Sequence, residues 1–206
     1  MTESQLNEAI DLYCRASGVF MTVANCWSSR WSSSTKDRPP ETTTESLLML
    51  ADLALAEAQQ LALVKGERRA LSPNTLVKLH NGIVYKFEIC RQKLKVSKRD
   101  YEEFAASFKA FIEDGMKCWE ALMLKKFGTL SYDAGYGFIT DIFFIFGSQN
   151  GLAVACITQA YNNLVDIQSS DYLPWRKMAS DNISTTNDLV ASYVKINVPI
   201  FHCAFN

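Results

Sequence analysis

The sequence predicts an all-α protein, built from antiparallel long helices in a tetratricopeptide-like solenoid, and three observations support this. Residues 47–65 are almost entirely apolar, apolar residues recur at helical spacing along much of the chain, and the links between the first long helices are short. A chain of 206 residues suits one domain with a sizeable core. Hydrophobic residues make up 48% and charged residues 21%, a composition that excludes wholesale disorder.

The apolar stretch at residues 47–65 reads LLMLADLALAEAQQLALVK. Because it has so few polar positions, we expect other helices to cover it on several sides, and its alanines allow those helices to approach closely. A membrane span is the alternative. We expect Asp52, Glu57 and the Gln59–Gln60 pair to exclude it, since they interrupt the run of roughly 18 apolar residues that a span needs. The stretch is therefore predicted to be the central buried helix.

The chain before this helix divides into one helix and one loop. Residues 2–26 have helical spacing with one slip near Gly18, and Thr2 is the expected N-cap. Residues 28–44 are rich in Ser, Thr and Pro and are predicted to be a loop. We expect one of the threonines before Glu45 to cap the central helix.

Two further long helices follow. Ser72 and Pro73 form a helix start, with Ser as cap and Pro in the first turn. Ser97 and Asp100 have the form of a capping box for the next helix, and Gly128 is its expected stop. The apolar face of the first helix is Leu76, Leu79, Ile83, Phe87, Cys90 and Leu94; that of the second is Tyr101, Phe104, Phe108, Phe111, Ile112, Cys118, Trp119, Leu122 and Met123.

The pattern is weaker after Gly128. Helix and strand both fit residues 131–146. Further on we expect a helix over residues 152–165, a loop over 169–175 and a last helix over 183–193. The whole chain, residues 1–206, is predicted to be a single helical domain.

No enzyme is predicted. The two histidines, His80 and His202, belong to no metal-ligand pattern, and we expect His80 to be a packed or partly exposed helix residue. Phosphate-loop, GxSxG and HExxH motifs are absent. Asp52 and Glu57, five residues apart, lie on different helix faces and are expected to accept hydrogen bonds from side-chain or backbone donors. We therefore expect no catalytic residue, metal, cofactor or small-molecule substrate.

We expect a cytosolic protein without a nucleic-acid partner. The formal charge of −1 does not favour a nucleic-acid partner. No apolar signal segment opens the chain, and the six scattered cysteines are expected to stay reduced, most of them as small core residues.

Two weaker signals concern membranes. A basic cluster at a helix–helix turn indicates either a solvated tip or peripheral contact with an anionic membrane surface. Its residues are Arg91, Lys93, Lys95, Lys98 and Arg99. Cys203, fourth from the end, has the position of a prenylated cysteine, although Asn is a poor last residue for that motif. Lipidation at Cys203 is thus a secondary hypothesis.

Several segments resemble the Bro-type domain family, the ALIX- and BROX-like endosomal adaptors. LALAEAQQLALVK at residues 53–65 resembles that family's LAQAQE signature and the lysine that follows it. The other segments are Ala16–Phe20, Leu76–Leu79, Lys125–Gly128, Asn187–Asp188 and Tyr193 through Val198–Pro199. The similarity is to the later, C-terminal portion of a Bro-type domain only, with the N-terminal portion absent.

The resemblance implies a non-enzymatic scaffold in endosomal sorting and protein transport, cytoplasmic and endosome-associated. Its implied partner is the C-terminal amphipathic helix of an ESCRT-III subunit, bound in a helix-in-groove mode. The family's contact positions fall at Glu3, Ala62, Thr75 and Leu79. Glu3 keeps an acidic group and Leu79 an apolar one, whereas Ala62 and Thr75 replace larger apolar residues.

These two replacements leave an alternative open. Each buried apolar anchor is worth about 1.5–3 kcal/mol, so losing two of them could abolish ESCRT-III binding. The alternative is a Bro-like scaffold that has lost this interaction and serves another partner, such as a small GTPase or a viral or signalling protein.

Overall fold

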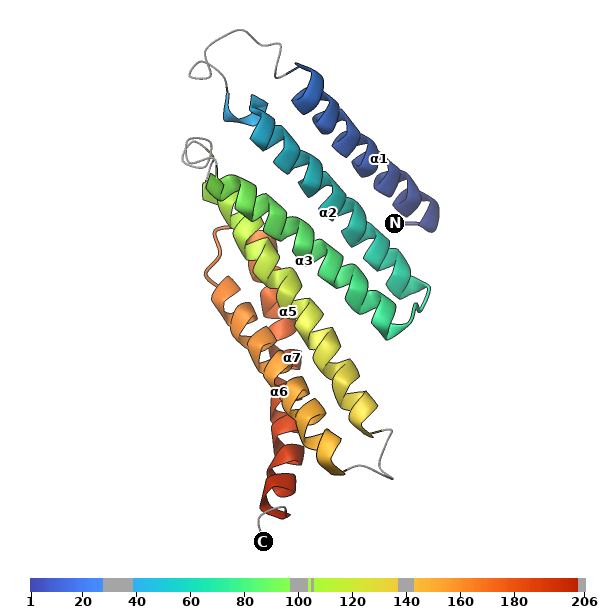
Figure 1. Ribbon diagram of the computed structural model, residues 1–206, viewed down its shortest axis with the longest axis vertical. Helices are drawn as coiled ribbons and strands as arrows, with labels where there is room; N and C mark the ends of the chain where they lie inside the picture. The colour runs from blue at the N-terminus through green and yellow to red at the C-terminus, as the bar shows by residue number, and fades with distance from the viewer. Residues whose placement is uncertain (28–38, 97–103, 105, 137–142, 204–206) are drawn as a thin grey trace. The chain divides into compact units, whose positions relative to one another are not determined.

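The computed structural model describes residues 1–27, 39–96, 104, 106–136 and 143–203 (Figure 1). Side chains are not described at 27, 40, 96, 134–136, 143–150 and 195–203. The chain divides into two compact units, unit 1 (Met1–Met116) and unit 2 (Lys117–Asn206). That the two units fold as a single domain stays a prediction.

Unit 1 begins with α1 (Glu3–Thr22), capped as predicted. The Thr2 side chain accepts a hydrogen bond from the backbone of Gln5, and the Gln5 side chain accepts one from the backbone of Thr2, which completes a capping box. The break in helical spacing predicted near Gly18 corresponds to a change of helix type four residues later. The α-helix ends at Thr22, whose hydroxyl donates to the Gly18 carbonyl, and the π-helix η1 (Val23–Trp27) follows.

The central helix is α2 (Thr44–Arg68), preceded by the short 3₁₀ helix η4 (Pro40–Thr42). Thr43 is the N-cap and accepts a hydrogen bond from the backbone of Ser46, so the predicted threonine cap is confirmed. Residues 28–38 of the predicted loop lie outside the described residues. As expected, α2 is covered on more than one side, by α1 and by α3 (Pro73–Val96) (Figure 1).

The polar residues of α2 do not by themselves exclude a membrane span, contrary to the expectation from sequence. Within the described residues, this helix is long and apolar enough to cross a membrane, by length and composition only. Such composition is shared by core helices of soluble proteins, and 44% of the apolar window in α2 is buried. The packing of α2 between α1 and α3 therefore supports the central buried helix, where polar interruptions alone did not.

The helix α3 begins as predicted, with the Ser72 hydroxyl accepting a hydrogen bond from the backbone of Thr75. A tight turn joins α2 to α3, and Ala70 within it has a φ of 51°. The core of unit 1 then forms where α2 and α3 meet the start of α5 (Ala106–Tyr136). Its buried residues are Met49, Cys90, Leu94 and Ile112, with Leu53, Phe104, Phe108 and Phe111 packed against them.

The predicted end of the long helix at Gly128 is wrong, because α5 continues to Tyr136. Gly128 is buried, and a Cβ atom there would lie 2.6 Å from Ile157 Cγ1 and 3.1 Å from the Ala153 carbonyl. Glycine is therefore required for close approach between two helices rather than for a helix end. The predicted capping box at Ser97 and Asp100 lies outside the described residues.

Unit 2 continues with α6 (Phe143–Ile167) and α7 (Leu173–Cys203), both longer than predicted. Residues 131–136 and 143–146, for which helix and strand were both open, are helical, and residues 137–142 lie outside the described residues. The predicted loop at 169–175 ends early because Pro174 is compatible with a first helical turn and Trp175 packs edge-on against Trp119. At its other end α7 passes the predicted stop and continues through Pro199.

Candidate partner-binding surface

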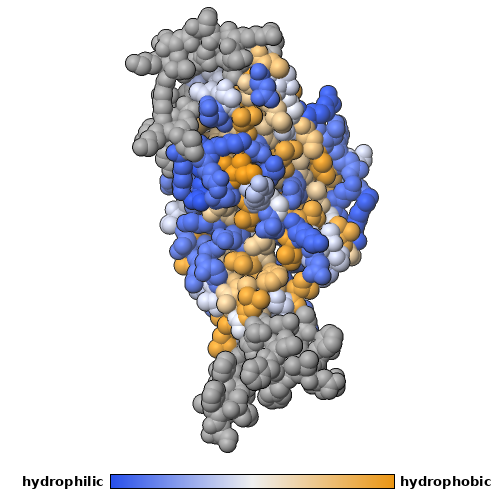
Figure 2. Space-filling model, in the orientation of Figure 1, coloured by the Kyte–Doolittle hydropathy of each residue, from blue (hydrophilic) through white to orange (hydrophobic). Residues whose placement is uncertain are grey.

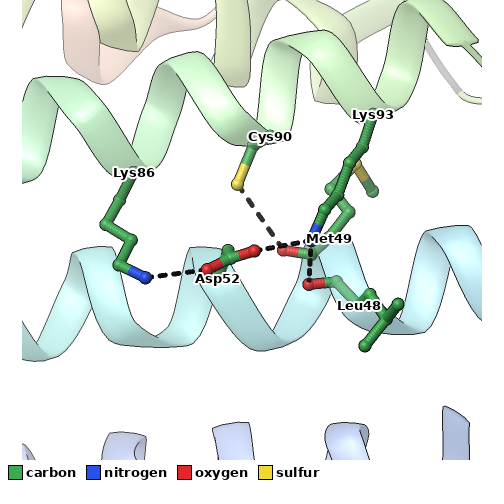
Figure 3. A network of polar contacts seen from close by, with 6 residues as sticks. All are labelled: Leu48, Met49, Asp52, Lys86, Cys90 and Lys93. Atoms are coloured by element: carbon green, nitrogen blue, oxygen red, sulfur yellow. Dashed lines mark hydrogen bonds and ion pairs between the residues drawn. The ribbon is translucent and has the colours of Figure 1, made fainter. Parts of the chain in front are cut away.

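A polar network joins α2 to α3 (Figure 3). The Asp52 carboxylate on α2 lies between two lysines of α3, with Oδ1 2.8 Å from Lys86 Nζ and Oδ2 2.6 Å from Lys93 Nζ. Lys93 also donates to the Leu48 carbonyl at 3.2 Å. Burial raises the pKa of Asp52, but the bonds and charges of the two lysines outweigh it and hold that pKa below its usual value. Asp52 is thus ionised at neutral pH, and the group consists of one carboxylate and two ammonium ions.

The neighbouring Cys90 provides no nucleophile. Its Sγ lies 3.5 Å from the Met49 carbonyl, and burial raises the pKa of the thiol to about 12 (Figure 3). The thiol therefore stays protonated at neutral pH. His80 is buried on α3, in line with the predicted packed residue. Among the described residues, no group of three or more His, Cys, Asp or Glu side chains could hold a metal ion.

Small residues bring α2 and α3 close together beyond this network. Gln59 of α2 crosses over Gly82 and donates from Nε2 to the Leu79 carbonyl at 2.9 Å. A Cβ atom at Gly82 would lie 1.9 Å from that Nε2. Similarly, a Cβ atom at Gly66 would lie 3.4 Å from Leu79 Cδ1. Ala62 lies between Gln59 and Gly66 along α2, so the antiparallel pairing places it near Leu79.

These contacts belong to two rows that follow alternating spacings of four and three residues, so each row lies on one side of its helix. We call them together the α2–α3 surface. The row on α2 is Leu48, Asp52, Leu55, Gln59 and Ala62, and the row on α3 is Thr75, Leu79, Gly82, Lys86, Ile89 and Lys93. Apart from the exposed Thr75, all are half-buried. Such a surface can offer apolar contact and charge to a partner without being part of the closed core.

Three of the four predicted partner-binding residues lie on this surface. Ala62 and Leu79 are half-buried near each other, and Thr75 is exposed in the first turn of α3, where its hydroxyl lies 2.8 Å from that of Ser72. Glu3 is on α1 instead and forms an ion pair with Arg69, just after α2. In Figure 1 the start of α1 lies beside the turn between α2 and α3, and Arg68 at the end of α2 donates to the Met1 carbonyl at 2.8 Å. The role of the four predicted residues in binding a partner stays a prediction.

The predicted basic cluster is less basic than its sequence suggests. Arg91 is paired with Glu88 through two hydrogen bonds of 2.7 and 2.8 Å, and Lys93 reaches toward α2. Lys95 is exposed on α3, whereas Lys98 and Arg99 lie outside the described residues. The membrane contact of this cluster stays a prediction, as does lipidation at Cys203, whose side chain is not described.

The hydrogen bonds predicted for Asp52 and Glu57 are confirmed. Asp52 accepts from the two lysines, and Glu57 Oε1 accepts from Gln60 Nε2 at 3.2 Å. Sequence reasoning missed that the lysine partners come from α3. The available signal was the matching interval of seven residues, which separates Leu79, Lys86 and Lys93 on α3 and also Asp52 and Gln59 on α2.

The helices and this surface define an all-α scaffold of long antiparallel helices. No protein-family model matches the sequence, and no curated protein matches it. Two solved structures resemble it in fold. ALIX BRO1 in complex with CHMP4C superposes with a TM-score of 0.76 at 16% identity, over 98% of this chain and 50% of that one. ALIX in complex with the SIVmac239 PYKEVTEDL late domain has a TM-score of 0.75 at 17% identity, over 98% of this chain and 26% of that one.

This likeness confirms the predicted Bro-type fold and the all-α class. At 16–17% identity it shows the fold alone. The chain spans half the length of one neighbour and about a quarter of the other, so the activities of those longer proteins are not thereby transferred to it.

Proposed function

We propose that this chain is a non-enzymatic interaction scaffold that binds an amphipathic helix of an ESCRT-III subunit along the α2–α3 surface, in the cytoplasm and at endosomes. The observation that carries the proposal is the match of 98% of the chain to ALIX BRO1 as found in complex with CHMP4C. The α2–α3 surface supports it, because its rows of half-buried side chains at four- and three-residue spacing suit a helical ligand.

Within this surface, Leu79 is the expected apolar contact. Its side chain is half-buried, and its backbone is held by the hydrogen bond from Gln59. A partially exposed leucine that is fixed in place can add buried apolar area on binding at little cost in side-chain entropy. Thr75, one turn earlier, would lie at the edge of the same contact.

The test is binding of the purified chain to a fluorescent peptide of the C-terminal helix of CHMP4C, measured by anisotropy. We expect micromolar binding that Leu79→Asp abolishes, because a carboxylate would have to be desolvated in the apolar contact. Leu12→Asp is the matched control: Leu12 is 55% exposed on α1, so the same substitution should leave binding unchanged. Circular dichroism establishes that each variant is folded.

A second variant, which should bind more tightly, keeps the proposal testable even if Leu79→Asp misfolds. Thr75 is exposed, so Thr75→Ile adds apolar area without disturbing the core. We expect it to tighten binding about threefold to tenfold, equivalent to roughly 1 kcal/mol. A folded wild-type chain that binds no peptide, together with a Thr75→Ile variant that binds none, would refute the proposal.

One observation favours a second candidate. Ala62 presents only a methyl group near Leu79, and the Thr75 hydroxyl is engaged with Ser72, so the apolar contact is smaller than the family pattern implies. A Bro-like scaffold that serves another partner, such as a GTPase or signalling protein, would follow if the helix peptide fails to bind.

A further inference from the structure

The α2–α3 surface carries an excess of positive charge at its centre. Lys86 and Lys93 both form their ion pairs with Asp52, so two ammonium groups share one carboxylate. The side chains of the two lysines are 25% and 31% exposed, and that of Asp52 is 18% exposed. The group therefore combines a net charge of +1 with partial removal from water, the condition under which an incoming anion is attracted most strongly.

The surroundings of this charge are apolar. Leu48 and Leu55 lie about one turn to either side of Asp52 on α2, and Ile89 lies between the two lysines on α3. All three side chains are half-buried. On the face shown in Figure 2, apolar side chains form small groups between hydrophilic ones. A ligand that covers the leucines would exclude water from the lysines and strengthen their contact with an anion.

Among the described residues, two acidic neighbours on α2 and α3, Glu57 and Glu88, do not pair with these lysines. Glu88 is two residues from Lys86, hence on another side of α3, and its carboxylate is occupied by Arg91. Glu57 is five residues from Asp52 and accepts from Gln60. An acidic group supplied by a partner is the natural complement.

We propose that Lys86 and Lys93 bind an acidic side chain of the docking helix, which joins Asp52 between them and fixes the register of that helix. The two residues are seven apart, or about 10 Å, along α3, but both ammonium groups lie within 2.8 Å of the Asp52 carboxylate, so they form one compact hydrogen-bond donor site. The favoured ligand is an amphipathic helix with a Glu or Asp between two apolar positions spaced seven apart. This inference rests on the proposed function and adds the charge chemistry of the ligand.

The test compares two fluorescent peptides. One is the C-terminal helix of CHMP4C, and the other is the same peptide with each Glu and Asp replaced by Gln and Asn. We expect the full-length chain to bind the acidic peptide about fivefold more tightly, the size of a partly exposed charge contact. Lys86→Gln should lower the affinity for the acidic peptide to that for the amide peptide. Lys93 still pairs with Asp52 in that variant, so the fold is retained.

Lys95→Gln is the matched control. It removes the same charge from the same helix, but Lys95 is nine residues from Lys86 and thus on the opposite side of α3. It should leave the preference for the acidic peptide intact. Equal binding of both peptides to the wild-type chain would overturn the inference and leave the proposed function standing. Binding of neither peptide would overturn both.

Discussion

The contacts between α2 and α3 in unit 1 differ in kind from those among α5, α6 and α7 in unit 2. In unit 1 the helices are joined by half-buried polar groups, namely a carboxylate between two lysines and an amide donating to a carbonyl. Unit 2 also has polar contacts between helices, such as Asn163 Nδ2 to Glu120 Oε2 at 3.1 Å, but there an aromatic stack and a buried glycine pack the helices against each other. Tyr132 and Tyr193 stack with ring centroids 3.8 Å apart, and Gly128 lies directly against Ile157.

This difference determines which contacts between helices tolerate substitution. Polar groups that are still partly hydrated can exchange one partner for another at small net cost, because water or a ligand replaces what is lost. Close-packed side chains have no such substitute, since any change in volume must be absorbed by neighbours that cannot move. The chemistry of unit 1 therefore suits a binding surface, and that of unit 2 suits a structural core.

Substituting one glycine in each unit should expose the contrast most strongly. Gly128→Ala places a Cβ atom 2.6 Å from Ile157, which is fully buried and β-branched, so we expect a loss of about 2 kcal/mol in the free energy of unfolding. Gly82→Ala meets only the end of the flexible Gln59 side chain. The gain in helix propensity, about 1 kcal/mol, should offset the lost hydrogen bond and leave stability within about 0.5 kcal/mol.

Urea unfolding followed by circular dichroism measures both variants under one condition. Equal losses for the two substitutions would show that the α2–α3 surface is as closely packed as the core of unit 2. The α2–α3 contacts and the core of unit 2 would then not differ in their tolerance of added volume.

Asp52→Asn should have the next largest effect. It leaves two half-buried lysines without their carboxylate, and we expect a loss of about 1–2 kcal/mol at pH 7. Because folding lowers the pKa of Asp52, the wild-type stabilisation is present above the usual value near 4 and is lost as the pH falls through the lower folded-state pKa. The stability difference between the two proteins should therefore shrink below about pH 4.

Urea unfolding of wild type and Asp52→Asn at pH 3, 5 and 7 tests this. Lys95→Gln supplies the control for loss of a charge on an exposed side chain. A difference that stays constant across this range would mean that Asp52 acts through its shape rather than its charge.

Periodicity predicted the helices of unit 1 well because their caps and faces are local features. Thr2, Thr43 and Ser72 satisfy backbone groups within three residues, so the sequence alone specifies them. Gly128 was misread because a glycine that ends a helix and one that admits a neighbouring helix look alike in sequence. Only the tertiary contact with Ile157 distinguishes them.

Only part of the candidate surface could be predicted, because helical spacing is local whereas contacts between helices are not. Leu79, Ala62 and Thr75 came from a family pattern, and their gathering on one surface follows from helical spacing and a short link between α2 and α3. Lys93 was assigned to a basic cluster because its sequence neighbours are basic. Its actual partner, Asp52, is 41 residues away, and such a pairing depends on the register between two helices.

The smallest expected effect concerns Glu57, which lies on α2 close to Asp52 and, in the described part of the chain, has no cationic partner that compensates its burial. Burial raises the pKa of Glu57, and the hydrogen bond from Gln60 only partly opposes this. Its ionisation therefore disfavours folding. The stability is greatest below the usual pKa of about 4.5 and declines as the pH rises through the folded-state pKa.

Glu57→Gln should stabilise the chain by about 0.5 kcal/mol at pH 7 and by nothing measurable at pH 4. Glu8→Gln, on an exposed residue of α1, should change stability at neither pH, and urea unfolding at the two pH values distinguishes the pair. A loss of stability at pH 7 would instead mean that the Glu57 carboxylate is held by a contact stronger than that with Gln60, and that Glu57, like Asp52, favours folding when ionised.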